Sequence, residues 1–355
     1  TSTNADFNEY LKLQAKALRE ANPMLDAYAD RKWATLQDTP LEFTITRENY
    51  EDEMTGTIVE NKELSALLEK HGISPIPKDF LGGRVGIVNK KGTHALLAIK
   101  EYLPTLAKNM PFADEYEQNI STDTDAKQTM VDVDLVAVTG DVGEYRGGIT
   151  LAENLPNDDK LSLTIGGGRR NVYHRQIRFI SDMKKLQERL DEILDKEQHQ
   201  FYLDEADHWF TIGHENAHSL GPKKACETLG KYRNIIEENK ADMGALAFVD
   251  LLTELGMYTE EQRKQIIVTT IADNFLKSKP TMSQAHRVRT VMQNKYFAER
   301  GAYDIIDGKI HVNIDKVVPI AKEMLAEIIR IQIEGDFDKA EKYVLDNFVW
   351  TDNME

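Results

Sequence analysis

The second half of the chain is dominated by patterns typical of α-helices. The segment QIRFISDMKKLQERLDEILDKEQ, which begins at Gln176, places apolar and charged residues on opposite faces of a helix. Further long helical segments are predicted at 203–219, 224–256, 259–278, 283–300 and 313–333. One interruption, AYDIIDGKIHVN at 302–313, is predicted to form a β-hairpin that turns at Asp307-Gly308. A chain with this pattern has to bury most of its apolar surface between packed helices.

The first 165 residues have a mixed pattern. A helix is predicted at 7–36, and LEFTIT at 41–46 alternates apolar and polar residues as a strand does. The remaining predicted elements are strands at 84–88 and 131–140 and helices at 61–71 and 94–108. Because 355 residues exceed one average core, we predict a mixed α/β lobe at 1–165 and a mainly helical lobe at 166–355. The glycine-rich IGGGRR at their boundary lacks the Lys-Ser/Thr of a phosphate-binding loop and is predicted to be a turn.

Charge and cysteine content argue against several classes of protein. A net charge of −16 opposes nucleic-acid binding, which needs a basic face. With a single cysteine, Cys226, the chain has no internal disulfide framework and no cysteine-rich zinc site. Its apolar runs fall short of the roughly 18 residues of a membrane span, and no signal segment is visible at its start. We therefore predict a cytoplasmic protein. Because the chain begins at Thr1, a signal or lipoprotein leader that has been removed stays open as an alternative.

The sequence GHENAHSLGP at 213–222 contains the pattern His-Glu-x-x-His. On a helix, His214 and His218 lie one turn apart on the same face, where two imidazoles can chelate Zn²⁺. Glu215, next to the first histidine, can serve as general base for water at such a metal. The alternative is a helix with two ordinary histidines. Burying these groups without a metal or hydrogen-bond partners is costly, which favours the zinc site.

The helix predicted at IIEENKADMGALAFV supplies candidates for a third ligand. Its carboxylates, Glu237, Glu238 and Asp242, stand in an otherwise apolar segment. Glu238 follows His218 by 20 residues (238 − 218), enough for one helix to end and a second to return. We predict Glu238 as the third zinc ligand, with Glu237 and Asp242 behind the ligands, where a carboxylate fixes the tautomer of a histidine. The alternative is a solvated acidic face.

These motifs resemble those of the dipeptidyl peptidase III family of zinc metallopeptidases. Four further segments are similar to family segments and occur in the family's order: LEFTITRENYEDE at 41–53, GGRVGIVNKKGT at 82–93, AENLPNDDK at 152–160 and SQAHRVRTVMQNKYFAERG at 283–301. The likeness covers about residues 40–330. It implies an α+β, mostly α fold of two lobes, one mixed with a barrel-like sheet and one helical and zinc-binding, with a cleft between them.

The resemblance also implies roles for the residues around the metal. His214, His218 and Glu238 match the family's ligands for one zinc ion per chain, and Glu215 matches the catalytic base. His286, in the segment Gln-Ala-His, matches a histidine that stabilises the transition state. Taken by itself, His286 is equally an ordinary helical histidine.

Four residues of the first lobe match substrate-handling residues of the family. Tyr50 matches a tyrosine that donates to the developing oxyanion, and Glu48 a carboxylate that anchors the N-terminal ammonium of the substrate. Asn154 and Asn157 match asparagines that hold the N-terminal part of the peptide. Without the resemblance, Glu48 and Tyr50 fit an edge-strand pair, and Asn-Leu-Pro-Asn fits an ordinary turn.

The five-residue motif His-Glu-Asn-Ala-His differs from the His-Glu-x-x-Gly-His of the best-known family members. Followed by Leu-Gly-Pro, it resembles a bacterial and plant side branch, which in plants is fused to a Nudix hydrolase domain. Much of the family's N-terminal region, which helps to wall the cleft, has no counterpart here, so a more open substrate pocket is expected.

We therefore predict a zinc-dependent peptidase that resembles dipeptidyl peptidase III, in which zinc-activated water hydrolyses peptide bonds near a free N-terminus. Two alternatives stay open: a zinc hydrolase acting on a non-peptide substrate, and a non-catalytic peptide-binding protein. The expected partner is a peptide or another small amide. The sequence does not indicate an oligomeric state.

Overall fold

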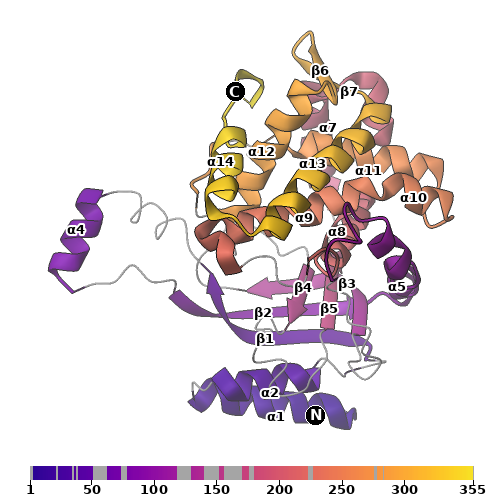
Figure 1. Cartoon of the computed structure of the whole chain (residues 1–355). Helices are drawn as coiled ribbons and strands as arrows, with labels where there is room; N and C mark the ends of the chain where they lie inside the picture. The colour runs from indigo at the N-terminus through magenta and orange to yellow at the C-terminus, as the bar shows by residue number, and fades with distance from the viewer. Residues whose placement is uncertain are drawn as a thin grey trace. The chain divides into compact units, whose positions relative to one another are not determined.

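A computed structural model describes the chain at residues 3–20, 23–33, 36, 39–50, 62–72, 78–117, 129–139, 152–155, 170–175, 180–222, 227–275, 278–282 and 284–354 (Figure 1). The chain divides into two compact units. Unit 1 comprises Thr1–Leu97 and Ser121–Ile177, and unit 2 comprises Ala98–Ile120 and Arg178–Glu355.

Unit 1 is built on a five-stranded sheet with the strand order β1-β2-β3-β5-β4. The strands are β1 (Leu41–Tyr50), β2 (Lys78–Val88), β3 (Thr129–Thr139), β4 (Ala152–Leu155) and β5 (Arg170–Arg175). All pairings are antiparallel except β3 with β5, which is parallel. The register shifts where Val85 pairs with Ala137 and Gly86 with Leu135, which leaves Val136 of β3 as the extra residue of a bulge, and bulges bend a sheet. The sheet curls into a half barrel, so the predicted α+β class with a barrel-like sheet is confirmed.

Two helices, α1 (Ala5–Glu20) and α2 (Pro23–Trp33), pack against this sheet. Their core residues are Tyr10, Ala29 and Trp33 with Leu36, and those of the sheet are Val131, Val133 and Val172. The predicted single helix at 7–36 is wrong, because α1 ends at Glu20 and α2 begins at Pro23. Proline lacks the amide hydrogen of a helix interior but suits the first turn, which explains a restart there. A further helix, α4 (Lys62–Lys70), agrees with the predicted segment 61–71.

Unit 2 is helical. Its helices are α7 (Ile180–Ile193), α8 (Asp204–Ala217), α9 (Arg233–Ala247), α10 (Val249–Glu254), α11 (Glu260–Asp273), α12 (Ala285–Glu299), α13 (Ile314–Glu334) and α14 (Phe337–Asn347), with the shorter turns η2 (Lys196–Phe201), η3 (Glu227–Tyr232) and η4 (Asp352–Met354). Helix α9 lies at the centre, in contact with α8, α12 and α13. Every residue from Asn239 to Ala247 is buried. Polar side chains on this helix therefore need partners inside the protein.

Most predicted elements of unit 2 are present, mostly with shorter bounds, whereas α13 is shifted by one residue from the predicted 313–333. The hairpin consists of β6 (Tyr303–Ile306) and β7 (Lys309–Val312). Asp307 and Gly308 at its turn have φ angles of 51° and 76°, the left-handed values that a two-residue hairpin turn requires. The predicted segment 224–256 is divided into η3, α9 and α10.

Helix α5 (Lys90–Lys108) runs from unit 1 into unit 2. Its second half belongs to unit 2 because of contacts distant in sequence: Tyr102 donates to the carbonyl of Leu255, and Arg330 binds Glu115 just beyond the helix. Unit 2 therefore includes Ala98–Ile120, which the boundary at 165/166 assigned to the first lobe. A division into a substrate-binding and a zinc-binding lobe stays a prediction.

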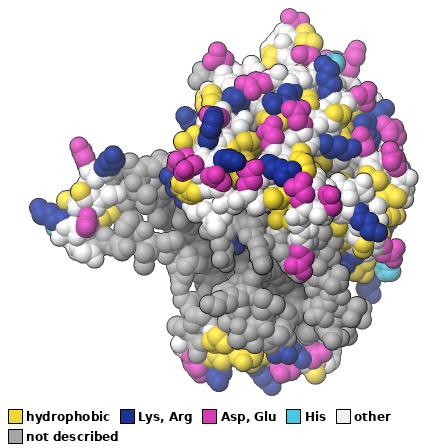
Figure 2. All heavy atoms as spheres, in the orientation of Figure 1, with side chains coloured by type: hydrophobic (Ala, Val, Ile, Leu, Met, Phe, Trp, Pro, Cys, Tyr) yellow, Lys and Arg dark blue, Asp and Glu magenta, His cyan; other side chains and the backbone are white. Residues whose placement is uncertain are grey.

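The described helices include none that is both long enough and apolar enough to cross a membrane. Figure 2 shows lysine and arginine side chains interspersed with acidic ones over the described residues of the visible face.

Candidate metal centre

Four small residues allow helices α8 and α9 to approach each other closely. A Cβ atom added to Gly244 would lie 2.8 Å from the Cβ of Ala217, and one added to Gly213 would lie 3.1 Å from the Cβ of Ala245. Larger side chains at these contacts would push the helices apart. The segments GHENA and MGALA thus set the helix spacing that brings the candidate ligands together.

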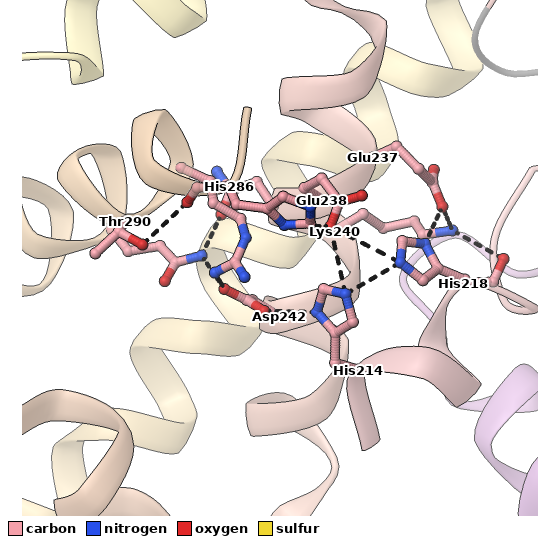
Figure 3. A network of polar contacts seen from close by, with 11 residues as sticks. His214, His218, Glu237, Glu238, Lys240, Asp242, His286 and Thr290 are labelled. Carbon is pink, nitrogen blue, oxygen red and sulfur yellow. Dashed lines mark hydrogen bonds and ion pairs between the residues drawn. The ribbon is translucent and has the colours of Figure 1, made fainter. Parts of the chain in front are cut away.

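The candidate ligands meet between these helices (Figure 3). His214 lies on α8, His218 directly follows its last residue, and Glu238 lies on α9. The two histidine Nε2 atoms are 3.1 Å apart, and Glu238 Oε2 lies 3.3 Å from that of His214 and 3.9 Å from that of His218. One ligand atom from each of the three lies within 4.8 Å of the others. Among the described residues, these three form the one such group of metal-binding side chains.

The hydrogen bonds behind the ligands test whether a cation fits here. Asp242 lies 2.7 Å from Nδ1 of His214, and Glu237 lies 2.9 Å from Nδ1 of His218. Because an ionised carboxylate only accepts, each Nδ1 donates, and each Nε2 of a neutral imidazole is then an acceptor. Glu238 Oε2 is buried and accepts no hydrogen bond of ordinary geometry. Three acceptor atoms thus converge without a proton between them, a donor set that fits a zinc ion.

Asp242 connects His214 to helix α12. Its second carboxylate oxygen accepts from the guanidinium of Arg289 and, at 2.8 Å, from the side-chain amide of Gln293. We call the contacts among His214, Asp242, Arg289 and Gln293 the Asp242 arm. Three donors satisfy one buried carboxylate, so its orientation behind His214 is fixed.

Glu237 has the corresponding place behind His218. It accepts from Lys240 Nζ at 2.8 Å and, through its other oxygen, from the Gln332 amide at 3.0 Å. The same ammonium donates to the carbonyl of Leu220 at 2.7 Å and lies 3.4 Å from that of His218. We call the contacts among His218, Glu237, Lys240 and Gln332 the Glu237 arm. This arm also holds the turn that follows α8.

Glu237 and Glu238 are both ionised at neutral pH. Burial raises the pKa of the Glu238 carboxyl, but the neighbouring His286 holds that pKa well below its usual range. Burial acts on Glu237 in the same direction, and the Lys240 ammonium with the His218 bond lowers its pKa to about 2. Ionised carboxylates and neutral imidazoles are the protonation states in which these residues bind zinc.

His286 lies beside the candidate ligands, on the first turn of α12. Its Nδ1 is 3.2 Å from Glu238 Oε2, and its side chain is 48% exposed. The ring of His286 therefore lies on the solvent side of the cluster, next to the candidate ligand Glu238.

Comparisons with known proteins place this site in a known fold. No protein-family model matches the chain. Nudix hydrolase 3 of Arabidopsis thaliana is 27% identical over 327 residues, which are 88% of this chain and 38% of the plant protein. The structure of dipeptidyl peptidase III from Caldithrix abyssi matches 99% of this chain and 64% of its own, with a TM-score of 0.76 and 24% identity. That of dipeptidyl-peptidase III from Corallococcus sp. strain EGB matches 99% and 62%, with a TM-score of 0.74 and 19% identity.

The chain has the dipeptidyl peptidase III fold. The predicted resemblance is confirmed at this level, and the similarity to a plant Nudix hydrolase is in line with the predicted side branch. Because the chain spans less than two thirds of each of these three proteins, the likeness establishes the fold alone. What the chain does has to be proposed from its site.

Glu215 follows His214 directly on α8, next to the candidate ligands, and is half-buried. The helix places it within the same turn as both candidate ligand histidines. This position agrees with the base predicted from the His-Glu-x-x-His pattern, and its role stays a prediction.

The predicted substrate-handling residues belong to unit 1. Glu48 and Tyr50 lie near the end of β1, opposite Phe80 and Lys78 of β2, and Asn154 lies on β4. The side chains of these three predicted residues, and the whole of Asn157, lie outside the described residues. Their roles stay predictions from the resemblance.

Four residues that contact this site were not predicted: Lys240, Arg289, Gln293 and Gln332. Lys240 was visible as a cation within EENKAD on an otherwise apolar helix. Arg289 and Gln293 follow His286 by three and seven positions (289 − 286 and 293 − 286), which puts all three on one helix face. That spacing is the signal that could have found them.

Proposed function

We propose that this chain is a zinc-dependent peptidase that resembles dipeptidyl peptidase III and hydrolyses peptide bonds near a free N-terminus. The observation that carries the proposal is the convergence of three acceptor atoms, from His214, His218 and Glu238, within this fold. Two histidines and one glutamate are a ligand set of catalytic zinc sites in peptidases.

His214, His218 and Glu238 would hold one zinc ion per chain. When bound, zinc supplies a Lewis acid that makes water a nucleophile near neutral pH and polarises a carbonyl oxygen. The residues of the chain supply the remaining steps. Glu215 takes a proton from the attacking water and passes it to the leaving amine.

Negative charge develops on the carbonyl oxygen as water adds to the peptide. Tyr50 and His286 are the donors assigned to this charge, and preorganised donors act most strongly where charge develops. His286 suits the task because its ring lies beside the ligand cluster, 3.2 Å from Glu238 Oε2, and its side chain is half-exposed.

Glu48 is assigned to the N-terminal ammonium of the substrate, and Asn154 and Asn157 to the first residues of the peptide. A carboxylate forms strong charge-assisted hydrogen bonds with an ammonium group. These three residues would fix the distance from the free amine to the bond that is cleaved.

Metal content and one substitution test the catalytic part of the proposal. The protein purified without chelator should contain one zinc ion per chain. Glu215→Gln should retain zinc and lose about 10²–10⁴-fold in hydrolysis rate, the usual contribution of a general base. Glu205→Gln, in the exposed first turn of the same helix, is the matched control and should retain activity. Absence of zinc from the wild-type protein would overturn the proposal.

A peptide panel tests the substrate part. Peptides with a free N-terminus should be cleaved, and their N-acetylated counterparts should not, because Glu48 needs an ammonium group. Cleavage of both kinds would favour a hydrolase of other amides or of non-peptide substrates. Zinc or peptide binding without turnover at any pH would favour a binding protein.

A further inference from the structure

Each candidate ligand histidine is backed by a carboxylate, and each of these carboxylates is backed by a cation. The two sets of contacts are His214–Asp242–Arg289 and His218–Glu237–Lys240. The cations come from different places: Arg289 from α12, and Lys240 from α9, three residues after Glu237. The same arrangement is thus built twice with different parts of the chain.

The two cations decide the charge of the centre. Glu238, Asp242 and Glu237 contribute three negative charges, and Arg289 and Lys240 return two positive charges, which leaves a net charge of −1. Each cation thus supplies the opposite charge that a buried carboxylate needs and contacts the carboxylate behind one histidine.

The contacts of each cation explain how it would act on its histidine. Arg289 and Gln293 bind the Asp242 oxygen that His214 leaves open, so the carboxylate cannot rotate away from His214. Lys240, only 4% exposed, binds Glu237 and also the carbonyl of Leu220 beyond the end of α8. It therefore fixes both the carboxylate behind His218 and the backbone beside it.

We propose that Arg289 and Lys240 are positioning residues of the zinc site, each holding the carboxylate behind one ligand histidine so that the histidine presents its Nε2 lone pair to the metal. The inference rests on the zinc site of the proposed function, and it is independent of substrate and of hydrolysis. Zinc affinity is therefore the quantity that tests it.

The test is a double-mutant cycle on zinc affinity, measured by competition with a chromophoric chelator. Arg289→Met should weaken zinc binding about 10–100-fold, the usual effect of losing a partner behind a metal ligand. In an Asp242→Asn background, where the carboxylate charge is gone, the same substitution should change the affinity little. Arg289→Lys keeps the charge and should restore most of the loss.

The Lys240 half is tested in the same way. Lys240→Met should weaken zinc binding by a similar factor, and it should do so less in a Glu237→Gln background. Some loss should remain there, because Lys240 also holds the carbonyl of Leu220. Lys240→Arg keeps the charge and should restore part of the affinity.

Arg287→Met is the matched control, because Arg287 lies on the same helix and binds Ser278 at 2.9 Å. It should bind zinc as the wild type does. Wild-type affinity in Arg289→Met, or additive losses in the cycle, would overturn the inference. If Arg289→Met does not fold, Arg289→Lys decides: affinity near that of the wild type is expected, and a large loss refutes the role of the charge.

The results also separate this inference from the proposed function. A wild-type protein that binds zinc and cleaves no peptide removes the proposed function alone. A wild-type protein that binds no zinc removes both.

Discussion

The Asp242 arm and the Glu237 arm perform the same task for two histidines in different surroundings. Asp242 is 1% exposed, whereas Glu237 is 27% exposed. Water can replace a lost hydrogen bond at Glu237, but the interior around Asp242 offers only protein groups. The same change of carboxylate to amide should therefore lower the free energy of unfolding more in the Asp242 arm than in the Glu237 arm.

The two arms also lead to different parts of the protein. From Gln293 the Asp242 arm continues to Asn274, whose side-chain amide donates to Gln293 at 3.3 Å. The backbone carbonyl of Asn274 accepts from the side chain of Asn294 at 3.4 Å, and the Asn294 oxygen accepts from the Tyr303 hydroxyl at 2.8 Å. The Glu237 arm instead reaches the backbone after α8 through Lys240. One arm anchors its histidine in a buried polar network, and the other anchors the end of a helix.

The largest expected difference is between Asp242→Asn and Glu237→Gln. Asparagine presents an amide NH₂ to one of the donors around Asp242 and leaves Arg289 without its counter-charge, which costs about 3–5 kcal/mol for a buried pair. Glutamine at 237 also places an amide NH₂ near a donor and leaves Lys240 without its counter-charge, but water can reach this side chain. We therefore expect the free energy of unfolding to fall by only about 1–2 kcal/mol. Urea unfolding of the metal-free variants measures both. Equal losses would show that burial does not distinguish the arms.

A second prediction concerns the helix contact that both arms share. Gly244→Ala would place a methyl group against Ala217, next to His218, and overpacking costs about 1–3 kcal/mol. The higher helix propensity of alanine than of glycine offsets at most about 1 kcal/mol of this cost. Gly213→Ala, whose new Cβ would lie farther from its neighbour Ala245, should cost less. Urea unfolding and zinc affinity together report whether the Glu237 side is displaced.

The control for this contact is the exchange of the two side chains. Ala217→Gly combined with Gly244→Ala moves the methyl group from one helix to the other and restores the space. The double variant should be less destabilised than the sum of the single variants. Additive losses would contradict the steric account.

The grouping of the candidate metal ligands could be predicted because their pattern is local. A short segment is enough to recognise two histidines four residues apart, and another is enough to recognise carboxylates on an apolar helix. The structure brings His214, His218 and Glu238 together as that pattern implies. Their spacing from His286 places Arg289 and Gln293 on its helix face, but it does not identify Asp242, 47 and 51 residues away, as their partner.

The fold was predictable to a similar extent. Long amphipathic segments predicted the helices of unit 2, and Asp307-Gly308 predicted its hairpin. Strands β4 and β5 were missed, because AENL and RNVYHR are short and polar and are held by pairing with residues distant in sequence. Pairing partners, rather than the strands' own composition, decide such elements.

The smallest expected effect lies at the far end of the Asp242 arm. Tyr303→Phe removes the hydroxyl that donates to the Asn294 oxygen and should lower the free energy of unfolding by about 1 kcal/mol at pH 7. Zinc affinity should not change, because four residues separate this hydroxyl from the candidate ligand His214. Burial raises the pKa of Tyr303 from 10.0 to about 12. A raised pKa means that the hydroxyl contributes fully below pH 10.

This contribution should disappear as the pH rises from 10 to about 12. The stability difference between the wild type and Tyr303→Phe should therefore narrow over that range in urea unfolding. Other tyrosines of unit 2 titrate in both proteins, so the difference isolates Tyr303. A stability difference that stays constant to pH 12 would mean that burial does not hold the Tyr303 hydroxyl protonated. A loss of zinc affinity in Tyr303→Phe would mean that Tyr303 is coupled to His214 through the Asp242 arm.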